Sequence, residues 1–327
     1  MKKITTILAL FCVIGLNAQD YVEFTNTELT YSQDFNGLES IEASTNVVWT
    51  NGTTPLLGWY AAKLMQDPAP QDITIYSTGS LTTTGATGLV SFGTDTDRAL
   101  GSRIANATGN VAYGVKIKNS TSAPITSLHV TYSGEQWTYA NACPQVLSFG
   151  YKLNADIKDT AFTAVPELQF SSPIFVAGIT ATNKIDGNLA ENKVVGITHT
   201  FNVNIPVGDS IVLRWLDIND PGTTECPGGV DHALSIDDVS VTATLQSGVH
   251  QTRDGNIKLF VSQDELVIKG DKIMKNIVIY NTLGSRMHAQ SVESGEIAIP
   301  VNQMSGGIYF AKVTLIDGSE STIRFIK

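Results

Sequence analysis

The sequence has few charged residues, few cysteines and no long apolar run. Charged residues make up only 16% of the 327 residues, which argues against a disordered chain and against a coiled coil. No apolar stretch reaches the ~20 residues that a membrane-spanning helix needs. No segment keeps a convincing helical period over three turns. The remaining class is a folded domain built from short strands, for which 28 glycines supply turns.

Motifs that carry catalysis are also missing. The five histidines show no metal-ligand spacing, so zinc is not expected. The sequence has neither a Gly-x-Ser-x-Gly turn nor a glycine loop that cradles phosphate. Carboxylate pairs for glycoside hydrolysis are defined by their separation in space and leave no pattern in a sequence. A non-catalytic protein is therefore the main prediction, and a secreted hydrolase of glycans stays open as the alternative.

The negative charge is concentrated in the middle of the chain. The net charge is −10, and residues 20–249 hold ten Lys and Arg against twenty-three Asp and Glu, a net of −13. Such a segment repels a phosphate backbone, so nucleic acid is excluded as a partner. An acidic excess favours solubility and is also compatible with calcium.

The N-terminus predicts export. Lys2 and Lys3 precede an apolar stretch from Ile7 to Leu16, and Ala18 is a small residue suited to cleavage, so residues 1–18 read as a signal peptide. The apolar stretch is too short to span a bilayer, and no transmembrane segment is expected.

Two cysteines follow the signal peptide. Cys143 and Cys226 both lie in polar, turn-like text, and an even pair in an exported chain favours a disulfide. Two unrelated thiols are the alternative interpretation.

The remaining chain reads as two β domains. Apolar residues alternate in many short segments separated by Gly, Asn, Asp and Pro, as in residues 200–205, which predicts an all-β jelly-roll or β-sandwich domain over residues 19–246. Residues 247–256 are polar without alternation and predict a linker. Residues 257–327 hold six or seven more strands, with Asp317-Gly318 as a hairpin signal, and predict a small Ig-like β-sandwich.

Three segments of the last domain form a recognisable pattern: Ile277-Val-Ile-Tyr-Asn-Thr-Leu-Gly284, Met304-Ser-Gly-Gly-Ile-Tyr-Phe-Ala-Lys-Val313 and the terminal Thr322-Ile-Arg-Phe-Ile-Lys327. In these segments the domain resembles the type A C-terminal sorting domain of the Bacteroidetes type IX (Por) secretion system. Members usually begin with Tyr-Pro-Asn-Pro, where this chain has Leu259-Phe-Val-Ser-Gln263. The resemblance implies passage through the outer membrane by the secretion machinery, with the protein secreted or held at the outer-membrane surface.

The acidic domain has two distinctive segments, residues 31–37 near its start and residues 234–241 near its end. In these segments it resembles, more loosely, the jelly-roll and carbohydrate-binding modules of bacterial surface proteins. In such modules the first and last strands lie side by side, often with a structural calcium ion between them. Asp34, Asp237 and Asp238 are the candidate calcium ligands, although adjacent strand residues point to opposite faces. Acids that protect a strand edge are an equally good interpretation. Asp217, Asp220 and Asp231 form a second acidic group, for which turn capping is the simpler interpretation.

Aromatic residues near loops are the candidate ligand contacts. Trp137 ends a strand at a loop, and Tyr139 and Trp59 lie in similar text, where sugar-binding modules place rings that stack on pyranoses. The sequence thus predicts an exported, non-catalytic surface or secreted binding protein with a glycan as candidate ligand. A structural adhesin or matrix component is the third class.

Overall fold

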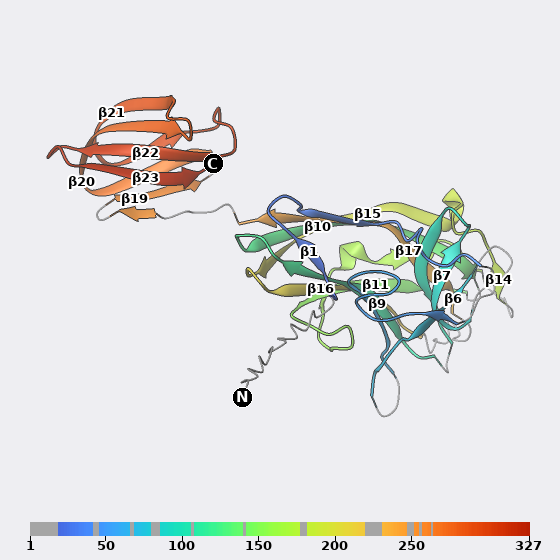
Figure 1. Cartoon of the computed structure of the whole chain (residues 1–327). Coiled ribbons are helices and arrows are strands. Elements are labelled where there is room, and N and C mark those ends of the chain that lie inside the picture. The colour runs from blue at the N-terminus through green and yellow to red at the C-terminus, as the bar shows by residue number, and fades with distance from the viewer. Residues whose placement is uncertain are drawn as a thin grey trace, which may run out of the picture. The chain divides into compact units, whose positions relative to one another are not determined.

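The computed structural model describes residues 19–41, 46–65, 69–79, 86–105, 108–139, 142–176, 182–219, 231–246, 252–254, 257–262 and 264–327. The predicted signal peptide lies outside these residues. The chain divides after Thr244 into two compact units, and each is described by itself. Nearly all of their regular secondary structure is β-strand (Figure 1), which confirms the predicted all-β class.

The N-terminal unit is a sandwich of two sheets. The eight-stranded sheet has the order β12-β11-β16-β9-β4-β5, with β1 on β9 and β13 on β11. Its strands are β1 (Val22–Phe24), β4 (Trp59–Lys63), β5 (Gln71–Asp72), β9 (Val111–Asn119), β11 (Val146–Leu153), β12 (Thr163–Ala164), β13 (Phe170–Ser171) and β16 (Ser210–Asp217). A short 3₁₀ helix, η1 (Pro166–Leu168), separates β12 from β13.

The nine-stranded sheet has the order β14-β10-β17-β8-β7-β6-β3, with β15 on β10 and β2 on β17. Its strands are β2 (Thr30–Gln33), β3 (Val47–Val48), β6 (Ile75–Thr78), β7 (Gly88–Gly93), β8 (Arg98–Arg103), β10 (Ile125–Tyr139), β14 (Asn183–Lys184), β15 (Lys193–Ile205) and β17 (Ala233–Leu245). A second 3₁₀ helix, η2 (Ala190–Asn192), precedes β15.

Aromatic rings fill the core of this unit. Trp215 on β16 stacks on Trp59 of β4 with ring centroids 5.9 Å apart and meets Tyr132 of β10 edge-on at 5.5 Å. Phe149 on β11 packs against the same indole at 5.0 Å. Each fully buried ring of this kind contributes about 1.5–3 kcal/mol relative to an exposed one. This cluster fixes the two sheets that carry the site described below.

β2 and β17 lie far apart in the sequence but are neighbours in the nine-stranded sheet. They pair antiparallel, with Gln33 opposite Val239. β17 pairs with β8 over residues 233–236 and with β2 from residue 239, and Asp238 between these stretches has φ of 51°. The strand beside the last strand of the unit is therefore the second one, β2, whereas the first strand, β1, pairs with β9, so the expected pairing of first and last strands is wrong in this respect. The pairing of β2 with β17 still brings Asp34 close to Asp238.

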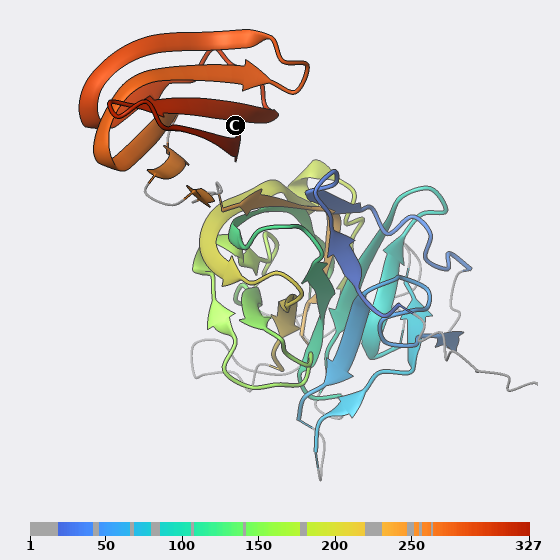
Figure 2. The same cartoon turned by 60° about the vertical axis from the view of Figure 1, so that its left-hand side comes forward.

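The C-terminal unit is one six-stranded sheet that folds over its own core. Its strands are β18 (Thr252–Asp254), β19 (Ile257–Ser262), β20 (Glu265–Asn281), β21 (Arg286–Pro300), β22 (Ile308–Leu315) and β23 (Glu320–Ile326). β20 changes its neighbour from β19 to β22 part way along. Figure 2 shows β20 and β21 as long curved strands in orange.

The core of this unit is mostly aliphatic, and one boundary differs from the prediction. Ile268, Ile277 and Val313 are buried in one cluster with Phe325. The predicted linker is wrong at residues 252–254, because these residues form β18 and pair with β19. These residues are polar and lack apolar alternation, so their sequence did not indicate a strand. The Gly-Asn pair that follows them consists of residue types that favour tight hairpins.

Candidate functional site

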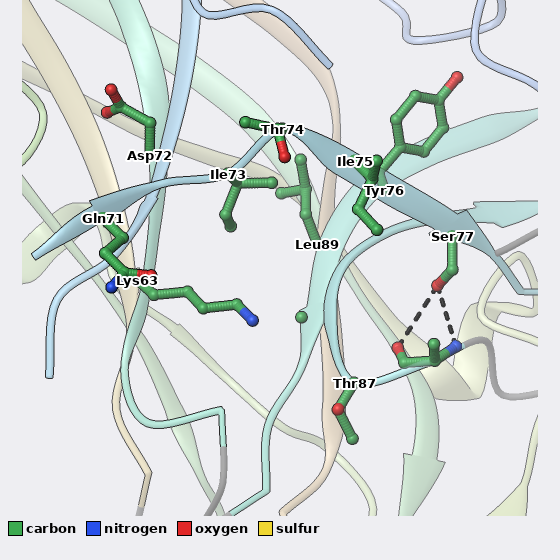
Figure 3. A pocket seen from close by; sticks show the side chains of 12 residues that line it. Lys63, Gln71, Asp72, Ile73, Thr74, Ile75, Tyr76, Ser77, Thr87 and Leu89 are labelled. Carbon is green, nitrogen blue, oxygen red and sulfur yellow. Dashed lines mark hydrogen bonds between the residues drawn. The ribbon is translucent and has the colours of Figure 1, made fainter. Parts of the chain in front are cut away.

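A polar pocket of about 280 Å³ lies at the edge of the sandwich (Figure 3). It is formed by the end of β4, by the continuous segment from β5 to β6 and by the beginning of β7. Its lining residues are Lys63, Gln71, Asp72, Ile73, Thr74, Ile75, Tyr76, Ser77, Ala86, Thr87, Gly88 and Leu89.

The pocket exists because the chain crosses from one sheet to the other here. β5 belongs to the eight-stranded sheet and β6 to the nine-stranded sheet, with Ile73 and Thr74 between them. The Ile73 amide donates to the Ala61 carbonyl at 3.0 Å, and the Thr74 carbonyl accepts from the Trp49 amide at 2.9 Å. The Ile73 side chain is buried, so the crossing segment is held as a fixed wall.

Two charged side chains line the pocket, and one of them is neutralised. Lys158 Nζ lies 2.7 Å from Asp72 Oδ1, and Asn51 Nδ2 donates to the same oxygen at 3.1 Å. The hydrogen bond to Asp72 raises the pKa of Lys158. Within the described residues, Lys63 forms no ion pair. Figure 3 shows its side chain extending into the middle of the pocket, away from the Asp72 carboxylate in this view.

The other polar groups differ in how far they are already engaged. Ser77 Oγ accepts from the Ala86 amide at 2.9 Å, and the buried Tyr76 hydroxyl accepts from the Glu39 amide at 3.0 Å. Burial is the main cause that raises the pKa of Tyr76. The side chains of Gln71, Thr74 and Thr87 are exposed. The arrangement can therefore donate hydrogen bonds to a polar ligand, with Lys63 as its cation.

The predicted ring platforms lie elsewhere. Trp59 is 0% exposed, and its Nε1 donates to the Tyr31 hydroxyl at 2.7 Å. Trp137 is 2% exposed and stacks on Phe92 with centroids 5.6 Å apart. A role for these two rings in stacking on a sugar does not agree with this burial, because neither ring face reaches solvent. Tyr139, at the end of β10, is half-buried.

The predicted calcium ligands separate into two places. Asp34 and Asp238 line the same shallow depression of about 350 Å³, whereas Asp237 is buried and does not line it. The Asp34 carboxylate also accepts from the Asn36 amide at 3.2 Å. Within the described ranges, no group of three or more His, Cys, Asp or Glu is placed to hold a metal ion. The three acids do not form one site, and calcium at the depression stays a prediction.

Sequence reasoning missed a buried acid pair. Glu135 on β10 is 1% exposed and Asp237 on the neighbouring β17 is 5% exposed. Burial is the main cause that raises the pKa of Glu135 to about 7 and that of Asp237 to about 8, and the charge of Glu135 adds to the second shift. Ser235 Oγ donates to Glu135 at 3.3 Å and accepts from Trp137 Nε1 at 2.9 Å. Perturbed acids are typical of catalytic sites, but these two are sealed from solvent.

A second buried network surrounds the predicted acidic group. Ser102 Oγ donates to Asp217 at 2.5 Å, and Gln145 Nε2 donates to Asp231 at 2.6 Å. These acids are structural in this arrangement, and Asp220 lies outside the described residues. Cys143 is disulfide-bonded, and its predicted partner Cys226 also lies outside them.

Comparison with known families decides the role of the C-terminal unit. Residues 261–327 match the family model of the secretion system C-terminal sorting domain. The protein is a cargo of the type IX secretion system. The sorting domain directs it to the cell surface or the extracellular space. No helix in the described part of the chain is long and apolar enough to cross a membrane.

No curated protein matches the sequence. Among solved structures, an immunoglobulin-like β-sandwich protein of Bacteroides vulgatus is 22% identical over 23% of this chain and 92% of its own, with a TM-score of 0.21. The adhesin domain of Epf from Streptococcus pyogenes is 10% identical over 91% of this chain and 90% of its own, with a TM-score of 0.26.

The β-D-glucuronidase of Dictyoglomus thermophilum is 10% identical over 91% of this chain, with a TM-score of 0.22, and this chain covers 44% of it. No activity is carried over from these likenesses.

Proposed function

We propose that this secreted cargo is a non-catalytic binding protein and that its N-terminal unit binds a glycan in the pocket between β4, β5, β6 and β7. The observation that carries the proposal is the polar pocket itself, on a domain that the sorting domain brings outside the cell. The exposed side chains of Gln71, Thr74 and Thr87 can exchange hydrogen bonds with sugar hydroxyl groups. Ile75, which is 48% exposed, supplies apolar surface for the CH groups of a sugar ring.

The pocket lacks an aromatic ring face among its described lining residues. Tyr76 is buried and meets Trp49 edge-on at 6.0 Å, so its ring is part of the core. Affinity must therefore come from hydrogen bonds and charge. Each such hydrogen bond contributes a net of about 0.5–1.5 kcal/mol, so we expect micromolar to millimolar affinity for a single site.

A glycan array with the purified secreted protein tests the proposal. We expect a subset of glycans to bind, and we expect Gln71→Ala combined with Thr74→Ala to weaken that binding by about tenfold. Thr163→Ala is the control, because Thr163 is an exposed threonine on β12, at the opposite end of the same sheet from β5. Equal binding by the double variant and the control would place the ligand elsewhere.

A turnover assay separates binding from hydrolysis. The glycans that bind are incubated with the protein, and new reducing ends are measured over a day. Binding without new reducing ends supports the proposal, and steady release of reducing ends contradicts it in favour of a hydrolase. Absence of binding to every glycan contradicts it in favour of a structural component.

A further inference from the structure

Lys63 occupies a distinctive position in the pocket. It is the last residue of β4 and lies opposite Gln71 of β5 and Val111 of β9. Its neighbours on both sides hold the backbone, so the start of its side chain is fixed while the ammonium group reaches into the pocket (Figure 3). A cation on a rigid strand end is better placed for recognition than one on a loop.

The charges that line the pocket do not cancel. Lys63 and Asp72 are its two charged lining residues, and Asp72 is already bound to Lys158 at 2.7 Å and to Asn51 at 3.1 Å. The pocket therefore presents one positive charge without an ion-pair partner among the described residues. This charge stands out because residues 20–249 carry a net of −13.

The size of the pocket and the chemistry of its lining restrict which anionic ligands it can bind. Ligand pockets commonly measure about 300–1,000 Å³, so this one suits a small part of a ligand. Its other lining groups are hydroxyl, amide and aliphatic side chains, which match a sugar better than a polyphosphate. One lysine can pair with one carboxylate or one sulfate through charge-assisted hydrogen bonds.

We infer that the pocket selects glycans that carry an anionic substituent, a carboxylate or a sulfate ester, and that Lys63 binds this substituent. The inference rests on the proposed function and narrows its ligand class. The hydroxyl and amide side chains around Lys63 bind the sugar ring, and the lysine distinguishes a charged ring from a neutral one. Because a polyanion is repelled by the acidic domain as a whole, binding depends on this local charge.

Calorimetry with matched probes tests the inference. The carboxylate arm compares a galacturonic acid tetramer with its methyl ester, and the sulfate arm compares a carrageenan tetrasaccharide with its desulfated form. We expect one charged probe to bind at least about tenfold more tightly than its neutral form. The arm that shows this difference identifies the source of the anion. Raising the salt concentration must weaken that binding because salt screens the charges.

Variants at position 63 complete the test. We expect Lys63→Met to lose about tenfold in affinity for the charged probe and Lys63→Arg to keep most of it. Lys116→Met is the matched control, because Lys116 lies on the neighbouring β9 and does not line the pocket. Melting temperatures show that each variant is folded.

The outcomes distinguish this inference from the proposed function. Charged and neutral probes that bind equally well, with no effect of Lys63→Met, overturn the inference and leave glycan binding intact. A charged probe that binds equally to Lys63→Met and to the unchanged protein also overturns it. If neither these probes nor any glycan of the array binds, the proposed function fails as well.

Discussion

The Ser102 hydroxyl on β8 donates a 2.5 Å hydrogen bond to the Asp217 carboxyl on β16, and this bond joins the two sheets of the sandwich. Both side chains are buried. Burial raises the pKa of Asp217 well above its usual value, and the charge of Asp231 acts in the same direction. The Ser102 hydroxyl therefore supplies one hydrogen bond to the Asp217 carboxyl group, which burial has removed from water.

Ser102→Ala removes this donor and leaves the buried carboxyl less well satisfied. We expect the free energy of unfolding to fall by about 1–3 kcal/mol, measured by urea denaturation. Ser127→Ala, at a half-buried position on β10, is the control and should change stability by about 0.5 kcal/mol or less. Equal losses in the two variants would show that the bond between the sheets contributes nothing specific.

The Glu135 and Asp237 pair predicts an unusual pH dependence. Their folded-state pKa values, about 7 and about 8, lie above the ordinary values of 4.5 and 3.8. The folded protein therefore keeps protons that the unfolded chain releases. Their contribution to stability is fully present below about pH 4 and is lost as the pH rises to about 8. Lys193 opposes the shift of Glu135, whereas Asp97 adds to both shifts.

Thermal melting between pH 5 and pH 8.5 measures this dependence. Asp237→Asn removes one titrating group, so the decline of melting temperature with pH should become shallower. Glu28→Gln is the control, because Glu28 is an exposed acid of the same unit whose charge does not act on the pKa of Glu135 or Asp237. A decline that is unchanged in Asp237→Asn would mean that the buried pair is not its source.

Cys143 is disulfide-bonded, and we predict that its partner is Cys226, as the sequence suggests. A bond between Cys143 and Cys226 closes a long loop, and its loss should destabilise the N-terminal unit by about 2–4 kcal/mol. Peptide mapping of the non-reduced protein should recover the two cysteines in one linked peptide. Recovery of Cys226 as a free thiol would rule out this pairing.

Calcium is a prediction for the depression between β2 and β17. Asp34 and Asp238 line it, whereas Asp237 is buried and is not among its lining residues. If calcium binds there, chelator should lower the melting temperature of the protein, because a ligand of the folded state stabilises it. Asp238→Asn should abolish that response and Asp237→Asn should preserve it. A melting curve that chelator leaves unchanged would remove calcium from this fold.

Local patterns predicted the strands better than they predicted the site. Alternation predicted a strand at residues 200–205, and these residues lie in β15 with Phe201 and Ile205 buried, because alternation follows directly from the strand geometry. The burial of Trp137 depends on Gly187, because a glycine without a side chain leaves room for the indole ring. A contact between residues 50 positions apart leaves no local pattern. The pocket around Lys63 was missed for the same reason, since β4, β5, β6 and β7 meet only in the fold.

Truncation after Leu245 is the most direct test of the role of the sorting domain in export. Each unit has its own core: Trp59 and Trp215 stack within the N-terminal unit, and Ile277 and Val313 are buried within the sorting domain. Loss of the sorting domain should therefore leave the N-terminal unit folded. In a bacterium with a type IX secretion system, we expect the truncated protein in the periplasm and the full chain at the surface or in the medium.

A point variant tests whether the secretion machinery recognises the folded sorting domain or only its amino-acid sequence. Val313→Asp puts a carboxylate into the core of β22, where Val313 is fully buried, and an unpaired buried charge should unfold the domain. Lys312→Asn changes the adjacent surface residue, removes its ion pair with Glu320 at 2.8 Å and should leave the domain folded. If the machinery recognises the folded sheet, Val313→Asp is retained in the periplasm like the truncation, and Lys312→Asn is exported. Export of the truncated chain at the full rate would contradict this role, because a cargo that leaves without its sorting domain does not use it.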